Sequence, residues 1–152
     1  MAELEYTLDG QKFMDKLEEL CHLTVSVGFQ NGVTNKSGED IASYAYYNQY
    51  GTSTIPARPF MSDAFDKHED EIHEFVASAA SQVCAGGDVQ QALNQIGAYG
   101  KGLIQSEIVD GEFVPNAPST IRKKGKGSRP LIDTGAMRQS VQYTISEEGE
   151  EE

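Results

Sequence analysis

The chain of 152 residues contains no tryptophan, two cysteines and five prolines, and it has half as many basic as acidic residues. No run of about 18 apolar residues occurs, so we expect no membrane span. The N-terminal MAELEYTLDG is acidic and has no apolar centre, so we do not expect a secretory signal. Cys21 and Cys84 form no CxxC motif. We expect both to be buried free thiols in a reducing compartment, where thiols stay reduced.

The shortage of positive charge argues against a general nucleic-acid binder. The net charge is −12, whereas binding to phosphates needs a net basic surface. Basic residues nevertheless gather in one loop, RKKGKGSR, which includes Arg122, Lys123, Lys124 and Arg129. This loop is interpreted in three ways: as a solvated loop, as an arm that docks on an acidic partner, or as a phosphate contact. The acidic residues 147–152 are either a disordered end or an acidic arm that pairs with a neighbour's basic loop.

Residues suited to catalysis or metal binding form no recognisable arrangement. His68 and His73 are five residues apart and do not share a helix face, so we expect surface residues rather than metal ligands. Cys21 and His22 are adjacent at the start of a strand, where neighbours point to opposite faces, which prevents nucleophile activation. The segment GKGLIQ lacks the Walker spacing. We therefore expect a protein that is not an enzyme and takes no metal or cofactor.

The first half of the chain predicts two helices and a strand. Phe13, Leu17 and Leu20 lie on one face of an amphipathic helix over residues 11–20. Residues 23–29 alternate between apolar and small or polar side chains, which predicts a half-buried strand. Asp40 can cap a helix over residues 41–50, and Gly51 follows where a helix end favours a left-handed residue.

The second half predicts a helical hairpin, a long loop and a second strand. One long helix reaches Cys84, and Asp88 can cap a second helix to about Ile108, whose Gly97 and Gly100 are expected to pack against the preceding helix. A loop over residues 110–130 with one helical turn from Ser119 is functional or disordered. Asp133 or Thr134 can cap a short helix that opens at Gly135, and residues 141–145 alternate as a strand.

These elements predict a single α+β domain over residues 1–146. A small antiparallel sheet packs against a long helical hairpin, with long functional loops. A two-stranded sheet is only marginally stable. We therefore expect a further strand, either from residues 50–61 or from a neighbouring subunit.

Aromatic residues and prolines mark a candidate contact region at the centre of the chain. Tyr44, Tyr46, Tyr47 and Tyr50 pack in the core or lie on the surface, but they also fit a protein–protein interface. The segment that follows, YGTSTIPARPFM, is predicted to be a rigid elbow that presents an assembly surface. Gly51 stops the helix, and Pro56 and Pro59 keep the chain extended. Arg58 reaches a carboxylate in its own fold or on a neighbour, Phe60 anchors the next helix, and both are counted among the interface residues.

Two blocks of sequence resemble a family of tailed-bacteriophage neck and tail-completion proteins. The run YAYYNQYGTSTIPARPFMSDAFDKHEDEI resembles the family's "(Y/W)NE(F/Y)GT" helix end followed by "IPARPF" and a long helix. The run PNAPSTIRKKGKGSRPLIDTGAMRQSV resembles the family's ending, with a basic segment and "PL(I/V)DTG". With the predicted hairpin between them, the blocks cover residues 41–145. Gln49 departs from the family's frequent glutamate, and the acidic end matches no part of the pattern.

The resemblance implies a structural protein of the virion, made in the host bacterial cytoplasm, that joins head and tail. Such proteins assemble as rings around the DNA channel, beside portal or adaptor proteins and tail terminator or tail tube proteins. DNA passes through without sequence-specific binding, and a negative channel would not hold it. Two alternatives stay open: a tail terminator or minor tail protein, and a small acidic host-directed inhibitor that binds through Tyr44–Tyr50.

Overall fold

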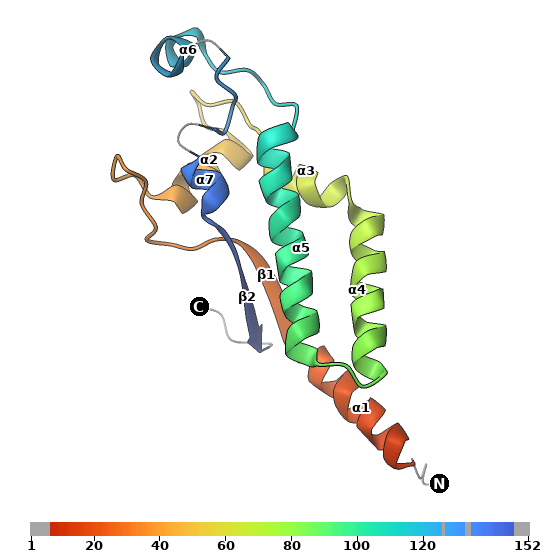
Figure 1. The fold of residues 1–152 in the computed structure, drawn as a ribbon. Helices are drawn as coiled ribbons and strands as arrows, with labels where there is room; N and C mark the ends of the chain where they lie inside the picture. Colours follow the sequence, from red (N-terminus) through yellow and green to blue (C-terminus); the bar gives the residue numbers. More distant parts are fainter. Residues whose placement is uncertain (1–6, 126, 133–134, 148–152) are drawn as a thin grey trace.

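A computed structural model describes residues 7–125, 127–132 and 135–147. Its elements follow in the order α1 (Leu8–Cys21), β1 (Leu23–Phe29), α2 (Ile41–Tyr50), α3 (Phe60–Asp66), α4 (Glu69–Cys84), α5 (Val89–Asp110), α6 (Pro118–Lys124), α7 (Ala136–Gln139) and β2 (Val141–Glu147). Helix α5 runs along the middle of the molecule between the sheet and α4 (Figure 1). The predicted α+β fold, a small antiparallel sheet packed against long helices, is confirmed.

The sheet joins two strands that are far apart in the sequence. β1 and β2 are antiparallel, with Leu23 opposite Glu147 at one end and Phe29 opposite Val141 at the other. Alternating residues of both strands turn their apolar side chains toward α5, as the period of two predicts. Residues 50–61 contribute no strand, so the prediction that this stretch adds one is wrong. A strand supplied by a neighbouring subunit stays a prediction.

Two glycines of α5 lie close to the sheet. A Cβ atom on Gly97 would overlap the ring of Tyr143, and one on Gly100 would lie 3.1 Å from a methyl carbon of Val27 and 3.8 Å from a ring carbon of Phe65. The prediction that these glycines pack against the preceding helix is therefore wrong for Gly97, whereas Gly100 also approaches Phe65 of α3, which lies in the predicted long helix. They let α5 approach β1 and β2 closely, which offsets the loss of about 1 kcal/mol of helix propensity for each glycine.

The buried residues form two clusters at different levels of α5. The larger includes Phe60, Ile104 and Val141, and it joins α2, α3 and α7 to the upper half of α5. The smaller includes Ala79, Val83 and Leu93, between α4 and the lower half of α5. No residue of α1 is buried, and this helix leads away from the body toward the N-terminus (Figure 1).

The long helix predicted to start near Phe60 is divided in two. α3 ends at Asp66 and α4 begins at Glu69, and His68 between them has φ −119° and ψ 19°, outside the helical range. Ala64 of α3 packs in the larger cluster, whereas Ala79 and Val83 of α4 pack in the smaller one. The break lets the chain change direction between the two clusters (Figure 1). The helical spacing of apolar residues continues through the break, so the sequence pattern does not reveal where the helix is interrupted.

Most of the predicted helix ends are confirmed. Asp40 accepts a hydrogen bond from the amide of Ser43, Asp88 accepts one from the amide of Gln91, and Gly51 has φ 76°. α6 begins at Pro118, one residue before the predicted turn. Gly135 precedes α7 with a left-handed φ of 75°, whereas the caps predicted at Asp133 and Thr134 lie outside the described residues.

The cysteines, the long loop and the C-terminal strand also differ in part from the predictions. Cys21 is exposed and Cys84 is partly exposed, so the expectation of buried thiols is wrong. The loop at residues 110–130 contains α6, a helix of seven residues, where one turn was predicted. β2 extends to Glu147, the first residue of the predicted acidic end, and residues 148–152 lie outside the described residues.

The cap at Asp40 gives a pH-dependent contribution to stability. Hydrogen bonds from the hydroxyl and amide of Ser43, and from the amide of Gly32, hold the pKa of Asp40 below its usual 3.8. The stabilisation is therefore present above that value and is lost as the pH falls through the lower pKa of the folded state. We expect melting temperatures of the wild type and Asp40→Asn to differ by a constant amount near neutral pH and to converge below pH 3.8. A difference that stays the same down to pH 2 would contradict this assignment.

Candidate assembly surfaces

A buried arginine joins the IPARPF segment to the start of the PNAPST segment. Only 6% of Arg58 is exposed. Its Nε donates to the carbonyl of Val114 (2.9 Å) and its Nη2 to the carbonyl of Pro115 (3.3 Å), while Nη1 donates to Oδ1 of Asn48 (3.2 Å). These partners are carbonyl oxygens, so the alternative of a carboxylate in the same chain is wrong within the described residues, and a carboxylate on a neighbour stays a prediction. We call Arg58 and these three partners the arginine clasp.

The Arg58 guanidinium is buried among neutral oxygen atoms, and its hydrogen-bond partners within the described residues include no carboxylate. Removal from water lowers the pKa of the Arg58 guanidinium below its usual value, and the nearby Tyr44 acts in the opposite direction. Guanidinium groups in proteins stay protonated at neutral pH. A buried cation is therefore held by oxygen dipoles, and each hydrogen bond to a charged donor contributes about 1.5–3 kcal/mol.

The elbow that carries Arg58 is a reversal of the chain, and the prediction of an extended segment is wrong. The amide of Thr52 donates to the carbonyl of Ile55, and the amide of Arg58 donates to the carbonyl of Asn48. At Gly51 a Cβ atom would lie 2.8 Å from the backbone nitrogen of Ala57, so only glycine fits where the two ends of the turn meet. Pro56 lies within this turn, and Pro59 follows it as the residue before α3.

Two buried amides that sequence reasoning did not single out complete the elbow. Asn48 receives the Arg58 hydrogen bond and donates its own Nδ2 to the carbonyl of Tyr44. Gln49 accepts from the amide of Met61 with its Oε1 and donates to the hydroxyl of Ser62 with its Nε2. Gln49 therefore caps the start of α3 from the neighbouring helix α2. The sequence signal that could have indicated this role is the pair of consecutive amide residues at the apolar side of α2.

Phe60 lies inside the fold and cannot contact a partner. Its side chain is 0% exposed, and its ring meets that of Phe29 edge to face at a centroid distance of 6.1 Å. The prediction that it anchors the next helix is confirmed, because it is the first residue of α3. Its place among the predicted interface residues is wrong, and the same burial removes Arg58 from a contact surface.

The tyrosines of α2 divide between the core and the surface. Tyr44 is partly buried against the larger cluster. Tyr46 and Tyr50 are 61% and 67% exposed, and their rings lie 4.8 Å apart, with Tyr47 against Tyr46. Beside them is a hollow of about 450 Å³ between α2 and α3, and its apolar lining includes Phe29, Met61 and Phe65. Exposed, clustered aromatic rings beside an apolar hollow are typical of a protein–protein contact.

The predicted basic residues lie on a projection that we call the basic arm, residues 112–132. It contains α6, which stands beyond the body of the molecule at the end opposite the N-terminus (Figure 1). Arg122 and Lys123 are exposed, whereas Lys124 is partly buried and donates to the carbonyl of Ile132. Arg129 donates to the carbonyl of Val109. The arm returns to the body at Leu131, which is buried in the larger cluster.

The arginine clasp holds the other side of this arm. Val114 and Pro115, which accept from Arg58, immediately precede Asn116, and Asn116 reaches Ser128 across the arm at 3.5 Å. The arm is therefore tied at Arg58, at Arg129 and at Leu131. The structure brings together Arg58, Asn48 and the base of the arm, but it leaves the tyrosine cluster on a separate surface of α2.

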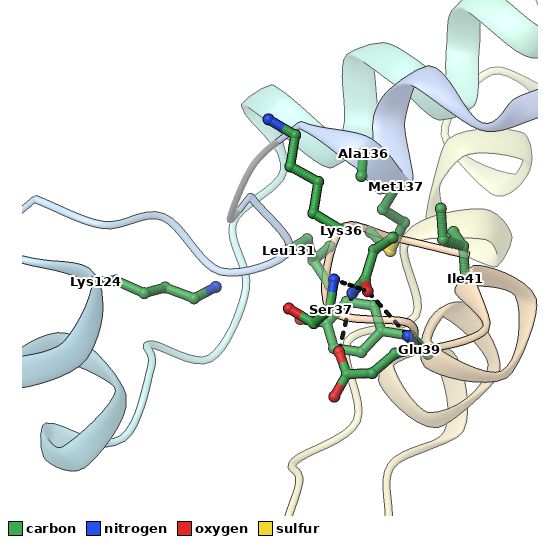
Figure 2. Close-up of a pocket in the computed structure, with 10 residues that line it drawn as sticks. Lys36, Ser37, Glu39, Ile41, Lys124, Leu131, Ala136 and Met137 are labelled. Atoms are coloured by element: carbon green, nitrogen blue, oxygen red, sulfur yellow. Dashed lines mark hydrogen bonds between the residues drawn. The ribbon is translucent and has the colours of Figure 1, made fainter. Parts of the chain in front are cut away.

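A second hollow lies between the loop before α2 and the base of the arm, and Figure 2 shows its lining. Its volume is about 220 Å³. Oδ1 of Asn35 accepts from the amides of Ser37 and Glu39, and Nδ2 of Asn35 donates to the Glu39 carboxylate. These polar groups therefore stabilise their own loop. Their arrangement includes no nucleophile paired with a base.

An ion pair between an exposed lysine and a buried glutamate links the end of α3 to α5. Lys67, the residue after α3, donates to the carboxylate of Glu107, and this hydrogen bond is the main cause that raises the pKa of Lys67. Glu107 is 8% exposed. The pair fixes the chain where α3 gives way to α4.

Within residues 7–125, 127–132 and 135–147, no group of three or more histidine, cysteine or acidic side chains is placed to hold a metal ion. In the same part of the chain, none of the helices has the length and apolarity needed to cross a bilayer. Comparisons with protein-family models, with curated proteins and with solved structures find no match to this chain.

Proposed function

We propose that the chain is a structural protein of a tailed-phage virion, a neck or tail-completion component that assembles as a ring around the DNA channel. The observation that carries the proposal is the arginine clasp. Arg58, from the IPARPF block, binds the carbonyls of Val114 and Pro115, where the PNAPST block begins. Two blocks that resemble one family are thus joined by direct contacts, 56 residues apart.

The physical character of the surfaces fits an assembly component better than an enzyme. Helix α2 displays exposed tyrosines beside an apolar hollow, and the clasp fixes the base of a charged arm. Fixed surfaces lose less conformational entropy when they bind a partner than mobile loops do. At the hollow of Figure 2, the side chain of Asn35 bonds to the carboxylate of Glu39 and to the backbone of its own loop.

The tyrosine cluster also fits the alternative of a host-directed binding protein. Exposed Tyr46 and Tyr50 would then contact a host protein, and the chain itself would act as a monomer. The two functions differ in self-association, which a measurement of mass separates. A tail terminator or minor tail protein would also self-associate, and its position in the particle distinguishes it.

The test is sedimentation velocity and mass photometry of the purified chain over a wide range of concentrations. We expect a discrete species with a mass that is a multiple of 16.6 kDa, and ring-shaped particles in negative-stain electron microscopy. Particles should also form, or grow, when purified neck proteins are added. Strictly monomeric behaviour in both settings would overturn the proposal, and a one-to-one complex with a host protein would favour the alternative.

A further inference from the structure

Two charged surfaces among the described residues have opposite signs and lie on different parts of the molecule. The basic arm presents Arg122 and Lys123 at its exposed tip. A second surface, which we call the acidic face, consists of the exposed residues Asp66, Glu69, Asp70 and Glu74 at the end of α3 and on α4. Figure 1 shows α6 at one end of the molecule, away from α4, which flanks α5 on the other side.

Ion pairs inside the chain leave both surfaces available. Among the described residues, the ion pairs are Lys16–Glu19, Lys67–Glu107 and His68–Glu71. None of them uses Arg122 or Lys123, and none uses the four residues of the acidic face. Five of the chain's twelve basic residues lie between Arg122 and Arg129, which leaves seven basic and twenty-four acidic residues in the rest. Two copies therefore repel each other except where an arm meets an acidic surface.

We propose that the basic arm of one copy binds the acidic face of a second copy. This inference rests on the self-assembly in the proposed function and names the surfaces that make the contact. Because the arm and the face are different surfaces, each bound copy still offers one free arm and one free face. Contacts of this kind join subunits head to tail, and they close into a ring when the rotation between copies permits.

Apolar side chains and a fixed backbone add to the complementarity of charge. Val76 is exposed on α4, seven residues after Glu69 and therefore on the same side of the helix. Ile121 and Val114 are exposed on the arm. Burial of these side chains would add apolar contacts to the ion pairs. The ties at Arg58 and Arg129 order the base of the arm before binding, which reduces the entropy lost.

A duplex of DNA is the other polyanion that a basic arm could bind. The arm offers few cations, and the remaining surface of the molecule is strongly negative, so phosphates are repelled around it. The acidic face of a second copy brings a local negative surface of similar size to the arm. Binding to DNA is therefore an outcome to be tested against the proposed contact.

The experiment reverses charges on each surface of the full-length chain and measures self-association by sedimentation velocity. The arm variant is Arg122→Glu with Lys123→Glu, and the face variant is Asp70→Lys with Glu74→Lys. We expect each to weaken the association constant by about tenfold or more, since two pairs turn from attractive to repulsive. The chain that carries both sets of changes should associate again, because its reversed arm meets a reversed face.

Matched controls carry the same change of net charge elsewhere. Lys12→Glu with Lys36→Glu matches the arm variant, and Glu18→Lys with Asp110→Lys matches the face variant; all four positions are exposed. Both controls should associate like the wild type. A mixture of the arm variant and the face variant should associate into assemblies that contain both, although neither variant associates alone. The reversed arm of the first then meets the reversed face of the second, and the unchanged arm of the second meets the unchanged face of the first.

The outcomes separate this inference from the proposed function. If the wild type assembles and the arm and face variants assemble equally well, the arm–face contact is wrong while the ring stands. The same conclusion follows if the doubly reversed chain does not recover, or if the arm variant loses only its binding to a 20-base-pair DNA duplex. A wild type that stays monomeric contradicts the proposed function itself.

Discussion

Replacement of Phe60 by alanine is expected to lower the free energy of unfolding by about 3–5 kcal/mol. The ring is fully buried, and it contacts Phe29 of β1 from the first position of α3. Its removal leaves a cavity where α2, α3, α5 and the sheet meet, in a cluster that collapses only partly because its neighbours belong to different elements. Urea-induced unfolding, followed by circular dichroism, measures the change.

The matched control for this prediction is Phe60→Leu, which keeps most of the apolar volume and should cost much less. Tyr46→Ala provides a surface control in the same region, because Tyr46 is 61% exposed. It should change the unfolding free energy by no more than about 0.5 kcal/mol. Equal stabilities for Phe60→Ala and Tyr46→Ala would show that the ring does not anchor α3.

Replacement of Arg58 by alanine is expected to cost about 3 kcal/mol and to loosen the basic arm. Three hydrogen bonds of the guanidinium disappear, and Oδ1 of the buried Asn48 loses its donor. Val114 and Pro115 are then released from the elbow. We expect trypsin to cleave the arm after Arg122 or Lys123 several times faster in this variant, in a short digestion of the folded protein analysed by mass spectrometry.

Arg58→Lys is the control that separates charge from geometry. Lysine keeps the cation but has no planar fork, so it cannot reach two carbonyls and the Asn48 amide together. We expect it to lose most of the stability and to expose the arm nearly as much as alanine does. If Arg58→Lys behaved like the wild type, the charge and not the fork would hold the arm.

The local features of this fold follow from residues close together in the sequence, and these were predicted well. Asp40 and Asp88 cap helices through amides three residues away, and the alternation at residues 23–29 and 141–145 identifies both strands. The pairing of those strands was also predicted, because each had one apolar face and the sheet needed a partner for it. Capping and periodicity are short-range properties, so one sequence is enough to read them.

The features that were missed depend on contacts between distant segments. The carbonyls that bind Arg58 lie 56 and 57 residues away, and no pattern near Arg58 indicates them. The break at His68 separates helices that serve different clusters, although the apolar spacing continues through it. Gly97 was assigned to the wrong neighbour for the same reason, since Tyr143 approaches it from the far end of the chain.

For the candidate surfaces, too, residue type could be predicted from the sequence, whereas burial could not. The exposed tyrosines and the basic residues could be found from composition alone, but their burial could not. Phe60 and Arg58 stand in the same block as Tyr50, yet the structure places them inside the fold and leaves Tyr50 outside. The block thus combines residues that build the elbow with residues that are free to meet a partner.

The proposed role at the junction of head and tail can be tested by an electron-microscopy map of intact tailed-phage particles whose genome encodes the chain. We expect ring-like density at the neck into which several copies of this fold can be fitted, with α6 of each copy near α4 of the next. Particles whose neck and tail contain no density for this fold, and no peptides of the chain by mass spectrometry, would contradict it.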